Sequence, residues 1–117
     1  MPLTRSLERP PARGSGGQLG LQVDIHPGIL AVAEISGELD IASATWLRET
    51  LLVAIQRHGP AICLDLRAVT FLDCSGVNAL LATARRARLE GGRMRVIGLS
   101  APARRVIELL GLKNVLT

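Results

Sequence analysis

At residues 61–77 the chain reads AICLDLRAVTFLDCSGV. The segment Ala61–Leu66 is almost continuously apolar, which is typical of a strand that is buried on both faces of a sheet. The polar turn Asp73-Cys74-Ser75-Gly76 follows a few residues later, and a helical pattern of apolar residues starts at Val77. The run therefore predicts a buried strand that leads, through a polar turn, into the N-terminus of a helix.

A helix N-terminus that carries small polar side chains can bind or accept an anion. Its first N–H groups have no partner within the helix, and the helix dipole also favours negative charge there. We therefore expect the functional chemistry of this chain to lie at residues 73–77.

The flanking segments extend the prediction to an α/β domain with a mixed sheet packed against helices. The turn signal His26-Pro27-Gly28 separates two apolar segments and predicts a β-hairpin, and Gly37-Glu38-Leu39-Asp40 is expected to end its second strand. The expected order is β-β-α-β-α-β-α-β, with strands at 19–25 and 29–35, a helix at 41–57, a strand at 61–66, a helix at 75–89, a strand at 94–99, a helix at 102–110 and a last short strand at 114–117.

Asp40 stands directly before one predicted helix, and Asp73 lies two residues before the start of the next. A carboxylate at this position can accept hydrogen bonds from the free N–H groups of the first helical turn, so both residues are natural N-caps. The strand–helix–strand unit between the hairpin and residue 66 predicts a parallel, right-handed crossover.

The composition indicates one domain with an aliphatic core. The chain has 117 residues, of which 48% are apolar, and Trp46 and Phe71 are its only aromatic residues. No apolar run reaches the roughly 20 residues that span a bilayer, and the N-terminal residues lack the apolar segment of a signal peptide. We therefore expect a soluble, cytoplasmic protein without a membrane partner.

Residues 1–18 are expected to be a disordered tail, and residues 19–117 to form the domain. The tail contains several prolines and glycines with scattered arginines but shows no periodic pattern, which is typical of disorder.

Several functional classes are disfavoured by the residues available. The net charge of +4 results from 13 Arg and one Lys against 10 Asp and Glu residues, but nucleic-acid binding is not expected because aromatic residues for base stacking are almost absent. Cys63 and Cys74 lack metal-ligand spacing, so no metal or other cofactor is expected. His26 and His58 lie in predicted turns, which disfavours a catalytic triad and hence an enzyme.

Three motifs, in this order along the chain, resemble the STAS domain, the fold of bacterial anti-sigma-factor antagonists. Residues 37–40 match the family's Gly-Glu-Leu-Asp motif. Leu64-Asp65-Leu66 with residues 71–77 matches its Asp-Leu strand and its Asp-Ser-Ser/Thr-Gly-Leu turn, and Ser100-Ala101-Pro102 precedes an amphipathic helix as it does in the family. The resemblance spans about residues 20–117 and implies the same mixed sheet.

The resemblance implies a partner, an anti-sigma factor that is also a serine kinase of the ATP-binding, kinase-like type. The partner-binding residues that it implies are Asp40, Asp73, Cys74, Ser75, Gly76 and Val77. In the family, the kinase phosphorylates the residue that directly follows the Asp, usually a Ser. That position is Cys74 here, so Ser75 is the expected phosphorylation site in its place.

The cysteine leaves other outcomes open. Cys74 would make the chain a constitutive, unphosphorylated STAS scaffold, or the protein has diverged to another use. A thiol at a helix N-terminus can also be a redox sensor, although the simplest interpretation is a small residue in a Ser-sized site.

STAS proteins usually carry one more amphipathic helix after the last strand, whereas this sequence stops at Thr117. We therefore expect part of the sheet or of the first helix to be uncovered, which favours a partner or a homodimer.

Overall fold

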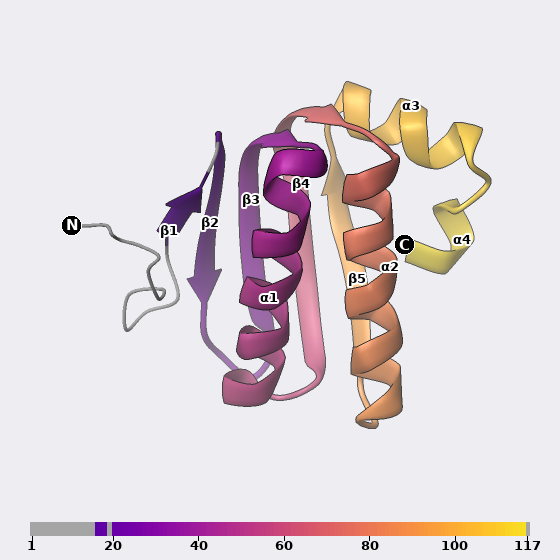
Figure 1. Ribbon diagram of the computed structural model, residues 1–117. Helices are drawn as coiled ribbons and strands as arrows, with labels where there is room; N and C mark the ends of the chain where they lie inside the picture. The colour runs from indigo at the N-terminus through magenta and orange to yellow at the C-terminus, as the bar shows by residue number, and fades with distance from the viewer. Residues whose placement is uncertain (1–15, 19, 117) are drawn as a thin grey trace.

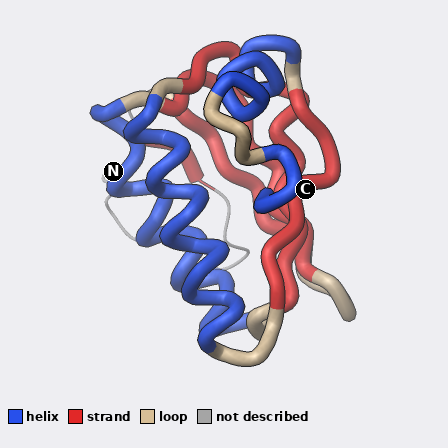
Figure 2. Tube along the Cα trace, turned by 90° about the vertical axis from the view of Figure 1, so that its right-hand side faces the viewer, coloured by secondary structure: helices blue, strands red, loops and turns tan. Residues whose placement is uncertain are grey.

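The computed structural model describes residues 16–18 and 20–116. A five-stranded sheet forms one layer, and helices α1 (Ile41–His58) and α2 (Cys74–Leu89) lie side by side on one of its faces (Figures 1 and 2). The strands follow the sheet in chain order: β1 (Gly16–Gln18), β2 (Leu21–His26), β3 (Ala31–Leu39), β4 (Ala61–Leu72) and β5 (Arg93–Leu99).

The sheet is mixed, as the sequence predicts. β1 with β2 and β2 with β3 are antiparallel pairs, which confirms the hairpin, whereas β3 with β4 and β4 with β5 are parallel. Parallel neighbours need a crossover connection, and α1 and α2 supply the two crossovers here.

β1 corrects the expected boundary of the N-terminal tail. Residues 16–18 pair with β2 through the register Gly16↔Val23 and Gln18↔Leu21, so these three residues belong to the sheet. Glycine has no side chain to show strand periodicity, which is why the pattern missed them. The rest of the expected tail, residues 1–15, lies outside the described residues.

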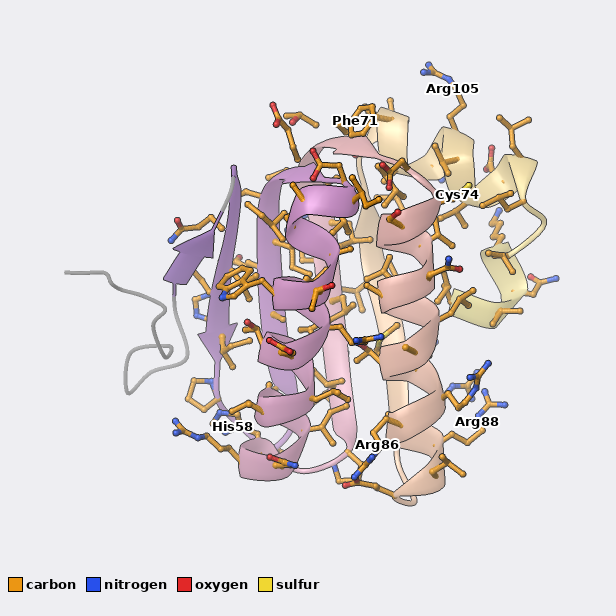
Figure 3. The ribbon with its side chains drawn as sticks, viewed as in Figure 1. His58, Phe71, Cys74, Arg86, Arg88 and Arg105 are labelled. Carbon is orange, nitrogen blue, oxygen red and sulfur yellow. The ribbon has the colours of Figure 1, made fainter. Side chains whose placement is uncertain are left out.

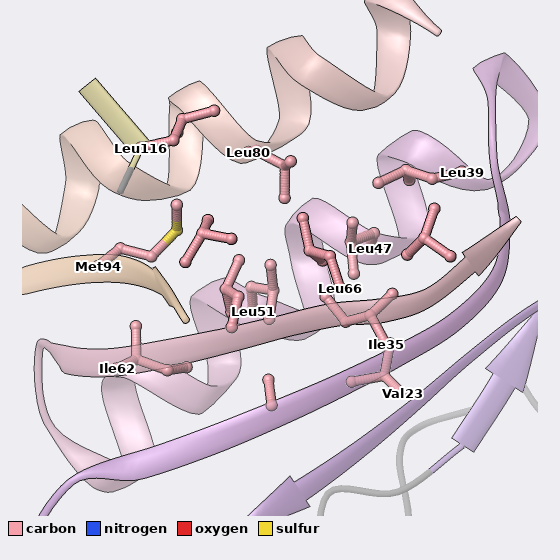
Figure 4. Packing of buried hydrophobic residues seen from close by; sticks show 14 of the residues in the cluster. Val23, Ile35, Leu39, Leu47, Leu51, Ile62, Leu66, Leu80, Met94 and Leu116 are labelled. Atoms are coloured by element: carbon pink, nitrogen blue, oxygen red, sulfur yellow. The ribbon is translucent and has the colours of Figure 1, made fainter. Parts of the chain in front are cut away.

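The hydrophobic core lies between the sheet and the two helices (Figure 4). Alternation along β3 places Ala33 and Ile35 in the core, while Glu34 points to the other face and is exposed. The core is aliphatic as expected: Trp46 only packs against its margin, and Phe71 is 49% exposed.

Strands β3 and β4 are both longer than the sequence suggests. The two strands were expected to end at residues 35 and 66, but β3 continues to Leu39 and β4 to Leu72, and these two end residues are partners. Gly37 adopts a φ of 100° inside β3, where a Cβ atom would lie 2.1 Å from the carbonyl oxygen of Gly20. The polar and glycine positions therefore mark irregularities in the parallel ladder, which shifts register between Gly37 and Glu38, and the strands run on past them.

The C-terminal segment is the clear error of the element prediction. Residues 114–117 were expected to be a strand, but Lys113–Leu116 form a short helix, α4, after α3 (Ala101–Leu109). The N–H group of Leu116 donates to the carbonyl oxygen of Leu112 at 3.1 Å, and the Leu116 side chain is 1% exposed. One buried leucine thus holds a single helical turn against α2 and β5.

Candidate functional site

The N-termini of α1 and α2 lie next to each other at one end of the molecule. Leu39 and Leu72 are register partners at the ends of the parallel strands β3 and β4, and each is followed by the N-cap aspartate of a helix. The N–H group of Asp73 also donates to the carbonyl oxygen of Leu39 at 3.3 Å. The two predicted motifs, 37–40 and 73–77, therefore form one surface.

Asp40 caps α1 with both its side chain and its backbone. Its Oδ1 atom accepts hydrogen bonds from the N–H groups of Ala42 at 3.0 Å and Ser43 at 3.2 Å. The Asp40 N–H group donates to the hydroxyl oxygen of Ser43 at 3.2 Å, which completes a capping box. The capping role predicted for Asp40 is confirmed.

Asp73 caps α2 by a single side-chain bond, in which its Oδ1 atom accepts from the N–H group of Gly76 at 3.1 Å. Cys74 and Ser75 occupy the first two positions of the helix. Cys74 is an exposed free thiol (Figure 3), whereas Ser75 is half-buried. The side chains of Cys74 and Ser75 are therefore accessible from solvent to different degrees.

Gly76 and Val77, in contrast, are buried beneath this surface. A Cβ atom at Gly76 would lie 2.6 Å from Cγ of Leu39 and 2.8 Å from Cδ1 of Leu72, so the absence of a side chain lets α2 approach the ends of both strands. Val77 is 2% exposed and belongs to the core. These two residues position the site, and their burial keeps them from direct contact with a partner.

Two exposed apolar side chains border the site, and the sequence analysis missed both. Ile41 is 78% exposed at the first position of α1, and Phe71 is 49% exposed two residues before the cap of α2. Phe71 lies near Cys74 at the same end of the molecule (Figure 3). The helix was expected to begin at residue 41 and does so, but the side chain at this first position stays exposed and does not pack in the core.

An open hollow of about 230 Å³ lies between α1 and α2, next to the two N-termini. Its lining residues are Ile41, Ala44, Thr45, Arg48, Ser75, Asn78 and Ala79. Ser75 therefore faces the groove between the helices, and no sequence signal pointed to Arg48 or Asn78, because residues that meet across two helices have no fixed spacing along the chain.

The histidines do not belong to this site. His58 ends α1 and lies at the opposite end of the molecule from Cys74 (Figure 3). Nε2 of His26 lies 2.8 Å from Oε1 of Glu34 on the face of the sheet away from the helices. Within residues 16–18 and 20–116, no group of three or more His, Cys, Asp or Glu side chains could hold a metal ion, and no helix there is long and apolar enough to cross a membrane.

Comparison with known proteins agrees with this architecture. The family model described as the STAS domain matches residues 20–117. The anti-sigma F factor antagonist of Paenibacillus polymyxa is 31% identical over 99 residues, which cover 84% of each chain. The name of this relative describes an antagonist of an anti-sigma factor.

Solved structures show the same relationship. The crystal structure of an anti-sigma factor antagonist from Mycobacterium paratuberculosis superposes with a TM-score of 0.72 at 29% identity, covering 82% of both chains. The Bacillus cell fate determinant SpoIIAA in its phosphorylated form superposes with a TM-score of 0.63 at 26% identity, covering 83% of this chain and 88% of the other. Because the family model spans nearly all of the described residues, this chain belongs to the STAS domain family.

Proposed function

We propose that this chain is an anti-sigma-factor antagonist that acts in the cytoplasm. It would bind a kinase-like, ATP-binding anti-sigma factor through the joined N-termini of α1 and α2 and so free a sigma factor for transcription. The names of the relatives support an antagonist, and the motifs of residues 37–40 and 73–77 lie together at one end of the molecule.

The observation that carries the proposal is the composition of one exposed rim, which is formed by Asp40, Ile41, Phe71, Asp73 and Cys74. Cys74 is exposed at the start of α2, and Ile41 and Phe71 add exposed apolar surface at the same end of the molecule. Exposed apolar side chains beside polar groups are typical of protein–protein contact sites. Because the rim contains Asp40 and Asp73 but no described catalytic group, binding is the activity that it supports best.

Phosphorylation of Ser75 would act on this rim by adding charge. The kinase would transfer the γ-phosphoryl group of ATP to the Ser75 oxygen, which loses its proton, and ADP would leave. The phosphate carries about −1.5 to −2 charges near neutral pH. It is tolerated at a helix N-terminus within its own fold, but facing an acidic or apolar partner it costs desolvation and repulsion, so the complex would dissociate.

An unphosphorylated STAS scaffold is the second candidate, and the exposed thiol favours it. Cys74 stands where the family usually carries the phosphate-accepting hydroxyl, and Ser75 is half-buried and turned toward the hollow. If the kinase cannot reach Ser75, the chain would bind its partner constitutively.

The first experiment captures the partner. The tagged full-length chain is used as bait in cytoplasmic extract from its source organism, and the recovered proteins are identified and purified. We expect a kinase-like, ATP-binding anti-sigma factor that binds the purified chain at micromolar concentration or below. Failure to recover any such protein at micromolar concentration would contradict the proposed function.

The second experiment separates the two candidates. The purified partner is incubated with the chain and ATP, and the product is analysed by mass spectrometry. Phosphate on Ser75, together with weakened binding of Ser75→Asp, supports the switch. Retained binding with no phosphate anywhere on the chain, and full affinity in Ser75→Asp, supports the scaffold. Ser75→Ala is the matched control, because it removes the hydroxyl without adding charge.

A further inference from the structure

The hollow between α1 and α2 contains polar side chains from both helices. Thr45 and Arg48 line it from α1, and Ser75 and Asn78 line it from α2. Buried Ala44 and Ala79 form part of its floor, and small side chains at these two positions leave the space open. The hollow is therefore built jointly by the two helices that carry the candidate site.

None of these four polar side chains has a partner within the described part of the chain. Neither Arg48 nor Asn78 makes an ion pair or side-chain hydrogen bond there, and the same holds for the hydroxyl groups of Thr45 and Ser75. Elsewhere in the described residues, by contrast, Arg67 and Arg86 are paired with Asp65 and Glu90. A guanidinium group can donate five N–H bonds, so Arg48 brings its full donor capacity to the hollow.

We propose that this hollow is a receiving site for a carboxylate side chain of the anti-sigma factor, with Arg48 as its ion-pair partner. The inference rests on the proposed function and adds a specificity-determining residue to it. Arg48 can bind a carboxylate through two parallel N–H bonds, while Asn78 and the hydroxyl groups of Thr45 and Ser75 donate to its remaining lone pairs.

The charges around the site favour an acidic group over a basic or apolar one. Asp40 and Asp73 accept backbone N–H bonds at the helix N-termini, and neither forms an ion pair with Arg48 within the described residues. The volume of about 230 Å³ suits a single side chain rather than a helix or a strand. An apolar side chain would leave four unpaired polar groups covered by the partner, and each such group carries a desolvation cost.

The same geometry gives phosphorylation of Ser75 a direct way to weaken binding of the partner. A phosphate on Ser75 would stand in the hollow and pair with Arg48 of its own chain. It would then occupy the place of the partner's carboxylate and remove the cation that attracts it. Phosphorylation at Ser75 would therefore compete directly with the partner's side chain at this hollow.

The test measures the affinity of the purified chain for the anti-sigma factor recovered by the capture experiment, using calorimetry at several NaCl concentrations. Arg48→Gln is expected to weaken binding about fivefold to tenfold and to flatten its salt dependence, because a partly exposed ion pair is lost. Arg48→Lys should retain part of the affinity, since it keeps the charge but not the planar guanidinium group.

Arg57→Gln is the matched control. Arg57 is also an exposed arginine of α1, nine residues further on, which places it about 13 Å along the axis and half a turn around the helix. The Arg57→Gln variant should change the affinity for the anti-sigma factor by less than about twofold. Circular dichroism of each variant checks that the helices are intact.

Asn78→Asp provides a second, independent variant, because it supplies a carboxylate to the hollow from α2. It should weaken binding of the parent chain at least as much as Arg48→Gln does, because its carboxylate would both pair with Arg48 and repel the carboxylate of the partner. If Arg48→Gln and Arg57→Gln change the affinity for the anti-sigma factor equally, the inference about the hollow is wrong. The proposed function would still stand in that case, because the parent chain binds the anti-sigma factor. If the parent chain binds no anti-sigma factor, both fail.

Discussion

The backbone N–H group of Asp73 donates to the carbonyl oxygen of Leu39 at 3.3 Å. This one bond joins the loop before α2 to the end of β3, directly beside the N-cap of α1. Together with the parallel pairing of β3 and β4, it brings Asp40 and Asp73, which are 33 positions apart in the sequence, into a single rim. Both the construction of this rim and its role in binding can be tested by substitution.

Gly76→Ala should destabilise the fold by about 1–3 kcal/mol, because the new methyl group would be forced into Leu39 and Leu72. This cost outweighs the gain of up to about 1 kcal/mol that alanine brings to a helix. Urea unfolding measures the difference. Asn78→Ala, at an exposed position of the same helix, is the control and should change stability much less. An unchanged or raised midpoint for Gly76→Ala would contradict the close approach.

Asp40→Ala should lower the free energy of unfolding by about 1 kcal/mol, because α1 loses a side chain that accepts two backbone N–H groups. Asp40→Ser should recover most of this loss, since a hydroxyl oxygen can cap in the same way. Thermal unfolding followed by circular dichroism measures both variants. If alanine and serine are equally destabilising, the aspartate does not act as a cap.

Arg67→Gln should destabilise the chain at neutral pH and have a smaller effect in acid. The side-chain hydrogen bond from Arg67 holds the pKa of Asp65 below its ordinary value, and Nη2 of Arg67 lies 2.7 Å from Oδ2 of Asp65. A lowered folded-state pKa contributes stability above the unfolded pKa of about 3.9 and loses it as the pH falls through the folded value.

The guanidinium side chain of Arg67 is 73% exposed, so water screens the pair and the effect at neutral pH should be small. Unfolding of the parent and the variant is compared at neutral pH and at acidic pH values below the unfolded pKa of the carboxyl group. The gap between the two curves should narrow toward low pH. A gap of constant size across this range would show that Arg67 acts through packing instead.

Cys74→Ser should make the chain a substrate at the usual family position, if the partner is a kinase of the expected type. The residue is exposed at the start of α2, so the exchange of sulfur for oxygen should leave stability within about 0.5 kcal/mol of the parent. After incubation with partner and ATP, mass spectrometry should detect a phosphate at position 74 of this variant that Cys74→Ala lacks. Equal labelling of both variants would place the phosphate elsewhere.

Most of the fold could be predicted from local patterns. The alternation of residues 31–36 and the helical spacing after Asp40 and Asp73 depend only on which side chains face the core, and the structure confirms them. The errors have a common origin. β1 has a glycine-rich sequence without periodicity, and α4 is held by the burial of Leu116 against other elements.

Short stretches of sequence were enough to predict the family, the two capping aspartates and the position of Cys74 at the start of a helix, because each depends on residues that are close together along the chain. The packed fold was needed to show that residues 37–40 and 73–77 form one surface, that Ile41 and Phe71 are exposed beside it, and that Arg48 and Ser75 share a hollow. Parallel pairing of β3 with β4 brings two helix N-termini together across a long stretch of chain, and no local pattern encodes that proximity.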